Sequence, residues 1–336
     1  MNNQQLTILC NLLSLGKQRS FPRKVHGGLL HLMWKVTTDK GSYAIKQLSK
    51  NINLNRHIRN QYELTERIAS TFKAHGIPAI TSLTTKDGLS LVDAGNHTFI
   101  AYPWIDAKAL DSNEVSAQHT IKIAQLLAKM HALNLQFPEL TTPGYDVHAN
   151  DKIMYLIQSS INSNASFAKN LKKKQKLLID VNSKYQRAIV ILSASTVVAH
   201  GDMDQKNVLW DLNNNPILID WESARLINST QETLNAALDW SGITTGNLDI
   251  DIFTAMIVAY KKAGGVIDLK VLTAAFYAIL GNWLNWMIYN IERSLTTEQS
   301  AADEQYRGIE QVHQVLKSII YLEDKIEELT TLVNDI

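Results

Sequence analysis

The stretch VVAHGDMDQKNVLW, residues 197–210, places several chemically active side chains between two short apolar runs. It contains His200, Asp202 and Asn207, and the chain reaches another acid, Asp220, shortly afterwards. Phosphoryl transfer needs these side-chain types, because a carboxylate must orient or deprotonate the attacking hydroxyl and Mg²⁺ prefers hard oxygen ligands. We therefore expect the two acids and the amide to converge on one point.

The elements that must position these residues follow from the apolar pattern. Short apolar runs bounded by polar residues are typical of buried strands, which predicts a small β-rich island over residues 196–220. The first hundred residues also favour strands. LLHLMWKVTT and SYAIKQLS flank a hairpin signal at residues 39–41, and LSLVDAG and HTFIAYPWI flank a second turn at residues 95–96.

Helical periodicity dominates most of the remaining chain. Leu64, Ile68 and Phe72 recur at spacings of four within residues 55–74, which predicts one face of a helix. From residue 115 onward the pattern is mostly helical, notably over residues 165–193 and 248–332.

The motif HGDxxxxN followed by IDWE resembles the catalytic loop and the metal-binding Asp of the protein-kinase-like superfamily. Gly201 stands where protein kinases have Arg, and IDWE replaces Asp-Phe-Gly. With these two features, the sequence resembles the aminoglycoside phosphotransferase and choline kinase family of small-molecule kinases. The resemblance covers residues 20–295. The resemblance implies Asp202 as the catalytic base, Asn207 and Asp220 as Mg²⁺ ligands, and His200 as a residue that braces the loop.

The same resemblance implies an ATP site in the first lobe. Lys46 in YAIKQL matches the strand Lys that contacts the α- and β-phosphates, and the family pairs it with a Glu on the next helix. Glu63 and Glu66 both qualify, and we favour Glu63. Backbone groups at Gly28 are expected near phosphate, and those at Tyr102 and Trp104 near adenine. Since Pro103 has no N–H, the hydrogen bond to adenine is expected from a neighbour such as Trp104.

These features predict an α+β, bilobal protein-kinase-like fold. A small β-rich nucleotide-binding lobe is expected over residues 1–102, a hinge over 103–110, and a larger, mainly helical lobe with the catalytic loop and the acceptor site over 111–336.

The acceptor is expected to be a small hydroxyl compound rather than a protein. After Asp220 the chain has neither a long activation segment nor an Ala-Pro-Glu motif. The acids Glu232 and Asp239 and the aromatic residues Trp283 and Trp286 would suit an amino-bearing or cationic alcohol. An aromatic stripe at helical spacing is also typical of a core, and aminoglycoside, choline, thiamine and homoserine remain open as acceptors. A catalytically silent nucleotide-binding regulator is the alternative function, and a protein kinase is a weaker one.

Composition argues against a nucleic-acid-binding, membrane or secreted protein. The formal net charge of +1 gives no field to recruit nucleic acid or a membrane. A single cysteine, Cys10, rules out an intramolecular disulfide, and the N-terminus lacks the features of a signal peptide, so we expect a cytoplasmic protein. Residues 271–291 are uncharged over the length of a membrane span, but their Asn and Gly residues favour a buried helix.

Overall fold

A computed structural model describes residues 1–25, 30–50, 52–296 and 302–336. The chain divides into two compact units. The first unit comprises Met1–Asp111 and His200–Ala224, and the second comprises Ser112–Ala199 and Arg225–Ile336. The predicted division had placed residues 200–224 in the C-terminal lobe, and the structure instead groups this segment with the first 111 residues.

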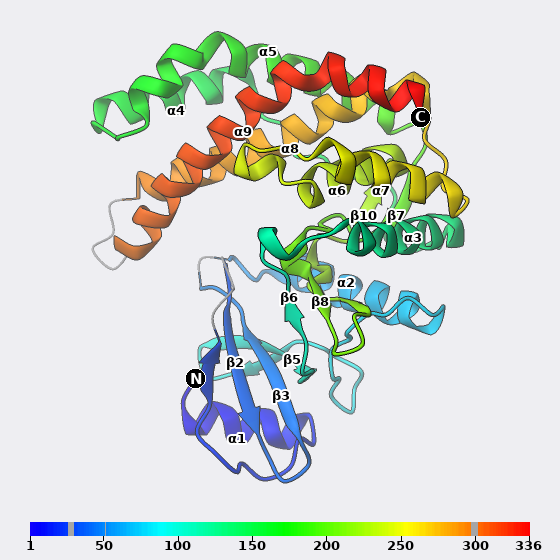
Figure 1. The fold of residues 1–336 in the computed structure, drawn as a ribbon. Helices are drawn as coiled ribbons and strands as arrows, with labels where there is room; N and C mark the ends of the chain where they lie inside the picture. Colours follow the sequence, from blue (N-terminus) through cyan, green and yellow to red (C-terminus); the bar gives the residue numbers. More distant parts are fainter. Residues whose placement is uncertain (26–29, 51, 297–301) are drawn as a thin grey trace. The chain divides into compact units, whose positions relative to one another are not determined.

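Within the described residues, the first unit contains a five-stranded antiparallel sheet in the order β1-β2-β3-β5-β4 (Figure 1). Its strands are β1 Arg23–Val25, β2 Leu32–Thr37, β3 Ser42–Gln47, β4 Val92–Ala94 and β5 His97–Pro103. The two predicted strand pairs are therefore confirmed. Gly41 and Gly95 hold positive φ angles of 149° and 63° in the connecting turns, a conformation that favours glycine.

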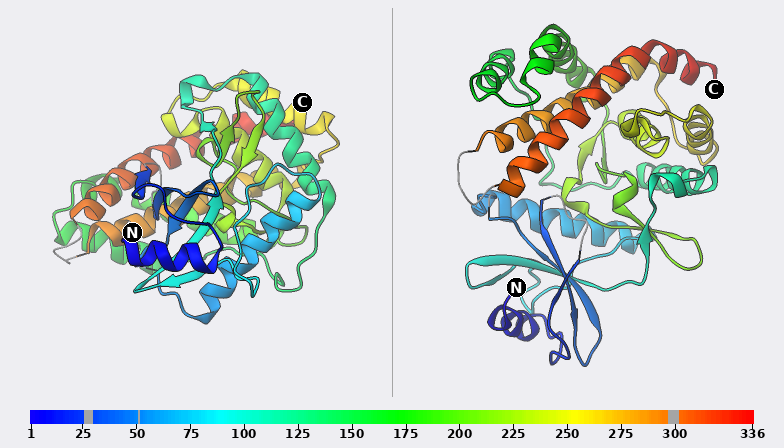
Figure 2. Two further views of the ribbon diagram at one scale, coloured as in Figure 1. Left: turned by 90° about the horizontal axis from the view of Figure 1, so that it is seen from below. Right: turned by 60° about the vertical axis from the view of Figure 1, so that its left-hand side comes forward.

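Two helices in the first unit carry apolar faces. Helix α1, Asn3–Leu12, begins with a capping box between Asn2 and Gln5. Its Leu6 and Leu9 join a core cluster with residues of the sheet, and Figure 2 shows α1, in dark blue, close to the strands. Helix α2, Arg56–Ala74, buries the predicted face of Leu64, Ile68 and Phe72.

The segment 200–224 belongs to the first unit because its strands pair there. Strand β6, Lys108–Ala109, pairs with β8, Val208–Trp210, which pairs with β9, Pro216–Leu218. A parallel bridge joins Ala79 to Leu218, and the indole of Trp221 stacks on Phe72 of α2. Strand pairing between distant parts of the sequence has no local signal, so the sequence pattern did not indicate this grouping.

The second unit is mainly helical. Its helices are α3 Ala117–Leu133, α4 Asn150–Asn162, α5 Ala168–Leu192, α6 Ser229–Trp240, α7 Ile250–Lys262, α8 Leu272–Ser294 and α9 Ala302–Asp335. A short antiparallel pair joins β7, Val197–Ala199, to β10, Arg225–Ile227.

Helix α8 is the apolar centre of the second unit and packs against α5 and α9. Helix α9 runs beside α8 in Figures 1 and 2. A Cβ atom at Gly281 would lie 2.1 Å from the ring of Tyr185, so only glycine lets α8 approach α5 this closely. The segment Leu269–Ser294 is long and apolar enough to cross a membrane, but 56% of its apolar stretch is buried inside the structure. This burial agrees with the predicted buried helix.

Candidate active site

The HGDxxxxN segment forms a loop before β8 that is braced by His200. The buried imidazole donates from Nε2 to the carbonyl of Ile219 at 2.9 Å, and its Nδ1 accepts from the backbone N–H of Asp202 at 3.3 Å. The ring also packs on Trp221, with centroids 4.6 Å apart. His200 therefore ties the loop that carries Asp202 to the strand end that carries Asp220.

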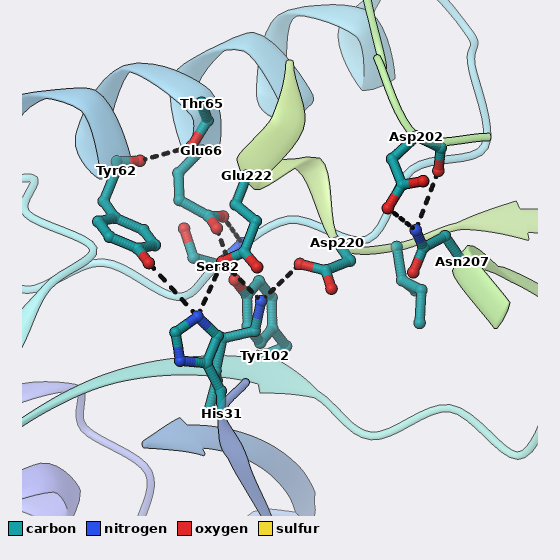
Figure 3. Close-up of polar contacts among 12 residues, drawn as sticks. His31, Tyr62, Thr65, Glu66, Ser82, Tyr102, Asp202, Asn207, Asp220 and Glu222 are labelled. Atoms are coloured by element: carbon teal, nitrogen blue, oxygen red, sulfur yellow. Dashed lines mark hydrogen bonds and ion pairs between the residues drawn. The ribbon is translucent and has the colours of Figure 1, made fainter. Parts of the chain in front are cut away.

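Asp202 and Asn207 face each other across this loop (Figure 3). The amide Nδ2 of Asn207 donates to Oδ2 of Asp202 at 2.8 Å and to its carbonyl at 2.9 Å. Because its nitrogen is committed to Asp202, the amide oxygen of Asn207 is the atom that can ligate a cation. The Asn207 residue is only 3% exposed, so its orientation is fixed.

Asp204 and Lys206, which lie between Asp202 and Asn207 in the motif, support the loop locally. Asp204 caps the 3₁₀ turn Gln205–Asn207 by accepting from the N–H of Asn207, and it forms an ion pair with Lys206. Burial and the charge of Asp202 raise the pKa of Asp204 to about 6.

Asp220 follows β9 and lies beside Lys46 of β3. Its backbone is left-handed, with φ 60° and ψ 61°, a conformation that is uncommon for a non-glycine residue and often marks a functional site. The Nζ of Lys46 lies 2.6 Å from Oδ1 of Asp220, and Lys46 is only 7% exposed.

A second acid, Glu222, also contacts Lys46. Its Oε2 lies 3.4 Å from Nζ of Lys46 and 3.1 Å from Nε2 of His31. Burial lowers the pKa of Lys46, but the charges of Glu222 and Asp220 outweigh burial and hold it above its ordinary value. Burial likewise opposes ionisation of Glu222, yet Lys46 and His31 hold its pKa well below the usual range.

The preference for Glu63 as the helix partner of Lys46 requires correction. The two carboxylate oxygens of Glu63 accept from the backbone N–H groups of Ser90 and Leu91, each at 2.9 Å. It is Glu66, one turn further along α2, whose charge acts on Lys46. Because Glu66 accepts from the Tyr102 hydroxyl at 2.5 Å, it belongs to the polar network around Lys46 in Figure 3.

The residues predicted to lie near adenine make contacts within the protein. The backbone N–H of Trp104 donates to the carbonyl of Ser42 at 3.0 Å, so it is engaged inside the sheet and is not the free donor that we expected. Tyr102 lies on β5 opposite Ala44, with its hydroxyl directed to Glu66. Gly28 lies outside the described residues.

The donor set fits a cation that keeps water and phosphate ligands. Among the described residues, no group of three or more His, Cys, Asp and Glu side chains could hold a metal ion by itself. The Asp220 carboxylate and the Asn207 amide oxygen are hard donors, and one or two protein ligands are sufficient for Mg²⁺ bound together with a nucleotide.

Comparison with models of protein families identifies the family of this chain. The model of the phosphotransferase enzyme family matches residues 23–265. The chain belongs to this family. A search of the curated proteins found no match. The predicted enzyme class, a small-molecule kinase, is thereby confirmed.

Solved structures confirm the predicted α+β, protein-kinase-like fold of this phosphotransferase. Spectinomycin phosphotransferase in complex with ADP and spectinomycin superposes with a TM-score of 0.71 at 14% identity, covering 96% of this chain and 99% of its own. Amicoumacin kinase gives a TM-score of 0.66 at 13% identity, covering 98% and 97%. Choline kinase from Streptococcus pneumoniae gives 0.60 at 15%, covering 95% and 99%.

The predicted acceptor acids of the phosphotransferase have different surroundings. Glu232 is 3% exposed, and its Oε2 lies 2.7 Å from Nε2 of His131, whose Nδ1 lies 2.8 Å from the Tyr260 hydroxyl. Its carboxylate is therefore part of the core of the helical unit, which corrects its assignment to the substrate. Asp239 is half-buried and accepts from Asn235 at 2.9 Å.

The two tryptophans of α8 that were predicted to face the acceptor, Trp283 and Trp286, are half-buried rather than fully buried. Trp286 stacks on Tyr289, with centroids 5.3 Å apart, and its indole N–H donates to Gln311 of α9. Trp283 is also half-buried. The stripe thus serves partly as a helix-packing face.

Sequence reasoning missed two residues of the polar network, His31 and Glu222. The signal for Glu222 was its place two residues after Asp220 in IDWE. His31 carries no local signal, because only the folded sheet brings it to Glu222, which is 191 residues away.

Proposed function

We propose that this phosphotransferase moves the γ-phosphate of ATP, with Mg²⁺, to a hydroxyl of a small amino-bearing or cationic compound. The observation that carries the proposal is the presence in one compact unit of the Asp202–Asn207 pair and the Lys46–Asp220 pair. No position of this set is replaced by a residue that lacks the required chemistry, which argues against a silent nucleotide-binding regulator.

Each residue has a role that its chemistry allows. Asp202 orients the acceptor hydroxyl and takes its proton as the new P–O bond forms and the bond to the β-phosphate oxygen breaks. Lys46 holds the α- and β-phosphates, while Asn207 and Asp220 would hold Mg²⁺, which neutralises phosphate charge when bound. His200 bonds to the backbone beside Asp202 and beside Asp220, and so holds these two acids in fixed positions relative to one another.

The acceptor class rests on the half-buried acid Asp239 and on the aromatic side chains of Trp283 and Trp286. An acid and π faces suit an ammonium group through charge pairing and cation–π contact. The segment 103–110 is proposed as the hinge for nucleotide-linked closure. The cytoplasm, where ATP and a reduced Cys10 coexist, is the proposed location.

The test is incubation of the purified protein with ATP, Mg²⁺ and a panel of amino alcohols and aminoglycosides, with products analysed by mass spectrometry. We expect one phosphate on a small acceptor, and product formation lowered by ~10²–10⁴ with Asp202→Asn. Phosphate found only on protein would overturn the small-molecule proposal, and full turnover by Asp202→Asn would overturn the assigned base.

A further inference from the structure

Lys46 faces two acids that come from one short segment. Asp220 lies 2.6 Å and Glu222 3.4 Å from its Nζ atom. In the proposed function, Asp220 must ligate the cation, so its carboxylate cannot serve Lys46 alone. A buried ammonium that loses its partner is costly, and Lys46 therefore needs a partner that does not bind the cation.

Glu222 is held in place by an imidazole of fixed tautomer. The backbone N–H of Ser49 donates to Nδ1 of His31 at 3.1 Å, so Nδ1 is unprotonated and Nε2 carries the hydrogen of the neutral ring. Nε2 then donates to Oε2 of Glu222 at 3.1 Å. The hydroxyl oxygen of Tyr62, 3.3 Å from Nε2, is a second acceptor for the same hydrogen (Figure 3).

The acids of α2 make their hydrogen bonds with other groups, although the charge of Glu66 still acts on Lys46. Glu63 binds two backbone N–H groups, and Glu66 accepts from Tyr102 and from the N–H of Ser82. Within the part of the chain that the structure describes, the ion pairs of Lys46 are made with Asp220 and Glu222.

We propose that His31 and Glu222 form a positioning pair that holds Lys46 for the nucleotide phosphates when Asp220 turns to the cation. This inference rests on the proposed function, in which Lys46 contacts phosphate. Glu222 thus takes the part of the acid that Lys46 would otherwise need from α2, and His31 acts through Glu222.

The experiment measures the dissociation constant for MgATP by calorimetry in a matched pair of His31 variants. In His31→Gln the amide nitrogen reaches the place of Nε2 and can still donate to Glu222, whereas the shorter side chain of His31→Asn cannot. We expect His31→Asn and Glu222→Gln to weaken MgATP binding about 10- to 100-fold, the range for hydrogen bonds to charged groups. His31→Gln should keep most of the affinity, and the exposed His57→Asn is the control.

Double variants test the order of action. If His31 acts only through Glu222, then His31→Asn should cost no further affinity in a Glu222→Gln background. Glu222→Gln should likewise cost nothing further once Lys46 is Ala. Additive losses in either cycle would overturn the proposal.

Nuclear magnetic resonance of ¹⁵N-histidine-labelled protein provides a readout that is independent of turnover. The His31 ring, assigned from the signals lost in His31→Gln, should show the neutral form protonated on Nε2. A ring protonated only on Nδ1 would overturn the proposal.

The remaining outcomes separate this inference from the proposed function. If raised Mg²⁺ rescues Glu222→Gln, Glu222 is a cation ligand and the positioning proposal fails. If Asp202→Asn lowers turnover as expected while Glu222→Gln and His31→Asn leave MgATP affinity unchanged, only this inference fails. If the parent protein puts phosphate only on protein, the proposed function fails, and if Asp202→Asn keeps full turnover, the assignment of the base fails.

Discussion

The Nζ atom of Lys46 lies 2.6 Å from Oδ1 of Asp220, although 174 residues separate them in the sequence. The contact joins strand β3 to the turn after β9, and both belong to one compact unit. Asp220 makes this contact from a left-handed backbone conformation. The residues assigned to phosphate and to metal are therefore already adjacent, and each can be tested separately.

Asp202 and Asp220 should fail differently when each is changed to Asn. Asp202→Asn removes a general base that acts mainly in the transition state, so turnover should fall by ~10²–10⁴ while nucleotide affinity barely changes. Asp220→Asn removes a formal charge from the assigned metal site, so both metal-dependent nucleotide binding and turnover should weaken.

A Mg²⁺ titration of both variants makes the distinction. Higher Mg²⁺ should partly rescue Asp220→Asn and leave Asp202→Asn unrescued. If the two variants respond alike, or if metal rescues Asp202→Asn, the assigned roles are wrong.

Lys46→Ala should weaken ATP binding, because it removes the buried cation assigned to the phosphates. An affinity loss of about tenfold or more is expected for a charge-assisted contact. Calorimetry with MgATP measures it, alongside a thermal melt to confirm folding. Lys86→Ala, at an exposed lysine, is the matched control and should bind like the parent. Unchanged affinity in Lys46→Ala would assign the phosphates to another lysine.

Glu232 and Asp239 should affect different properties. Glu232→Ala leaves Nε2 of His131 without its buried carboxylate partner, so the free energy of unfolding should drop by about 1–3 kcal/mol. Asp239→Asn should instead raise the KM for the acceptor more than the KM for ATP. Urea unfolding and steady-state kinetics on both variants measure this difference. A stable Glu232→Ala variant with a raised acceptor KM would return Glu232 to the substrate site.

Gly281→Ala should destabilise the protein, because the new Cβ would lie 2.1 Å from the Tyr185 ring and would push α8 away from α5. Overpacking of this kind costs about 1–3 kcal/mol. Thr273→Ala on an exposed position of the same helix should stay within about 0.5 kcal/mol. Chemical denaturation compares the two, and equal stability would contradict the close helix contact.

The pH dependence of stability should carry a signature of Glu66. Burial raises the pKa of Glu66 above its ordinary value of 4.5, despite the opposing effects of Tyr102 and Lys46. Between 4.5 and the raised pKa, the folded state binds more protons than the unfolded state, so this group makes stability fall as pH rises.

Glu66→Gln removes that dependence. Relative to the parent, the variant should gain stability as pH increases from about 4 towards neutrality. Urea midpoints at a series of pH values measure the difference between the two proteins. A difference that shrinks with rising pH would mean that the pKa of Glu66 is lowered instead.

Local signals predicted the parts of the fold that depend on local chemistry. The turns at Gly41 and Gly95 predicted both strand pairs, because their glycines permit the positive φ angles that the structure has. The spacing of Leu64, Ile68 and Phe72 predicted the buried face of α2, since a helix brings residues four apart to one side.

The errors come from partners that are distant in sequence. Trp104 was predicted to donate to adenine, but its N–H is bonded to the carbonyl of Ser42. Glu232 was predicted to bind the acceptor, but its carboxylate contacts His131 in the core. Neither partner lies near its residue in the chain. Charge and exposure at such positions depend on tertiary pairing, which the pattern of one segment does not encode.

Helix α1 determines how the chain can be shortened. Its Leu6 and Leu9 are fully buried in a cluster with Val36, Ile45 and Phe99 of the sheet. The family match begins only at residue 23, and it ends at residue 265, before α8 and α9. A chain trimmed to those limits would expose the apolar face of its five-stranded sheet to water and to other copies of itself, so it should be recovered as insoluble aggregate rather than as a smaller working enzyme.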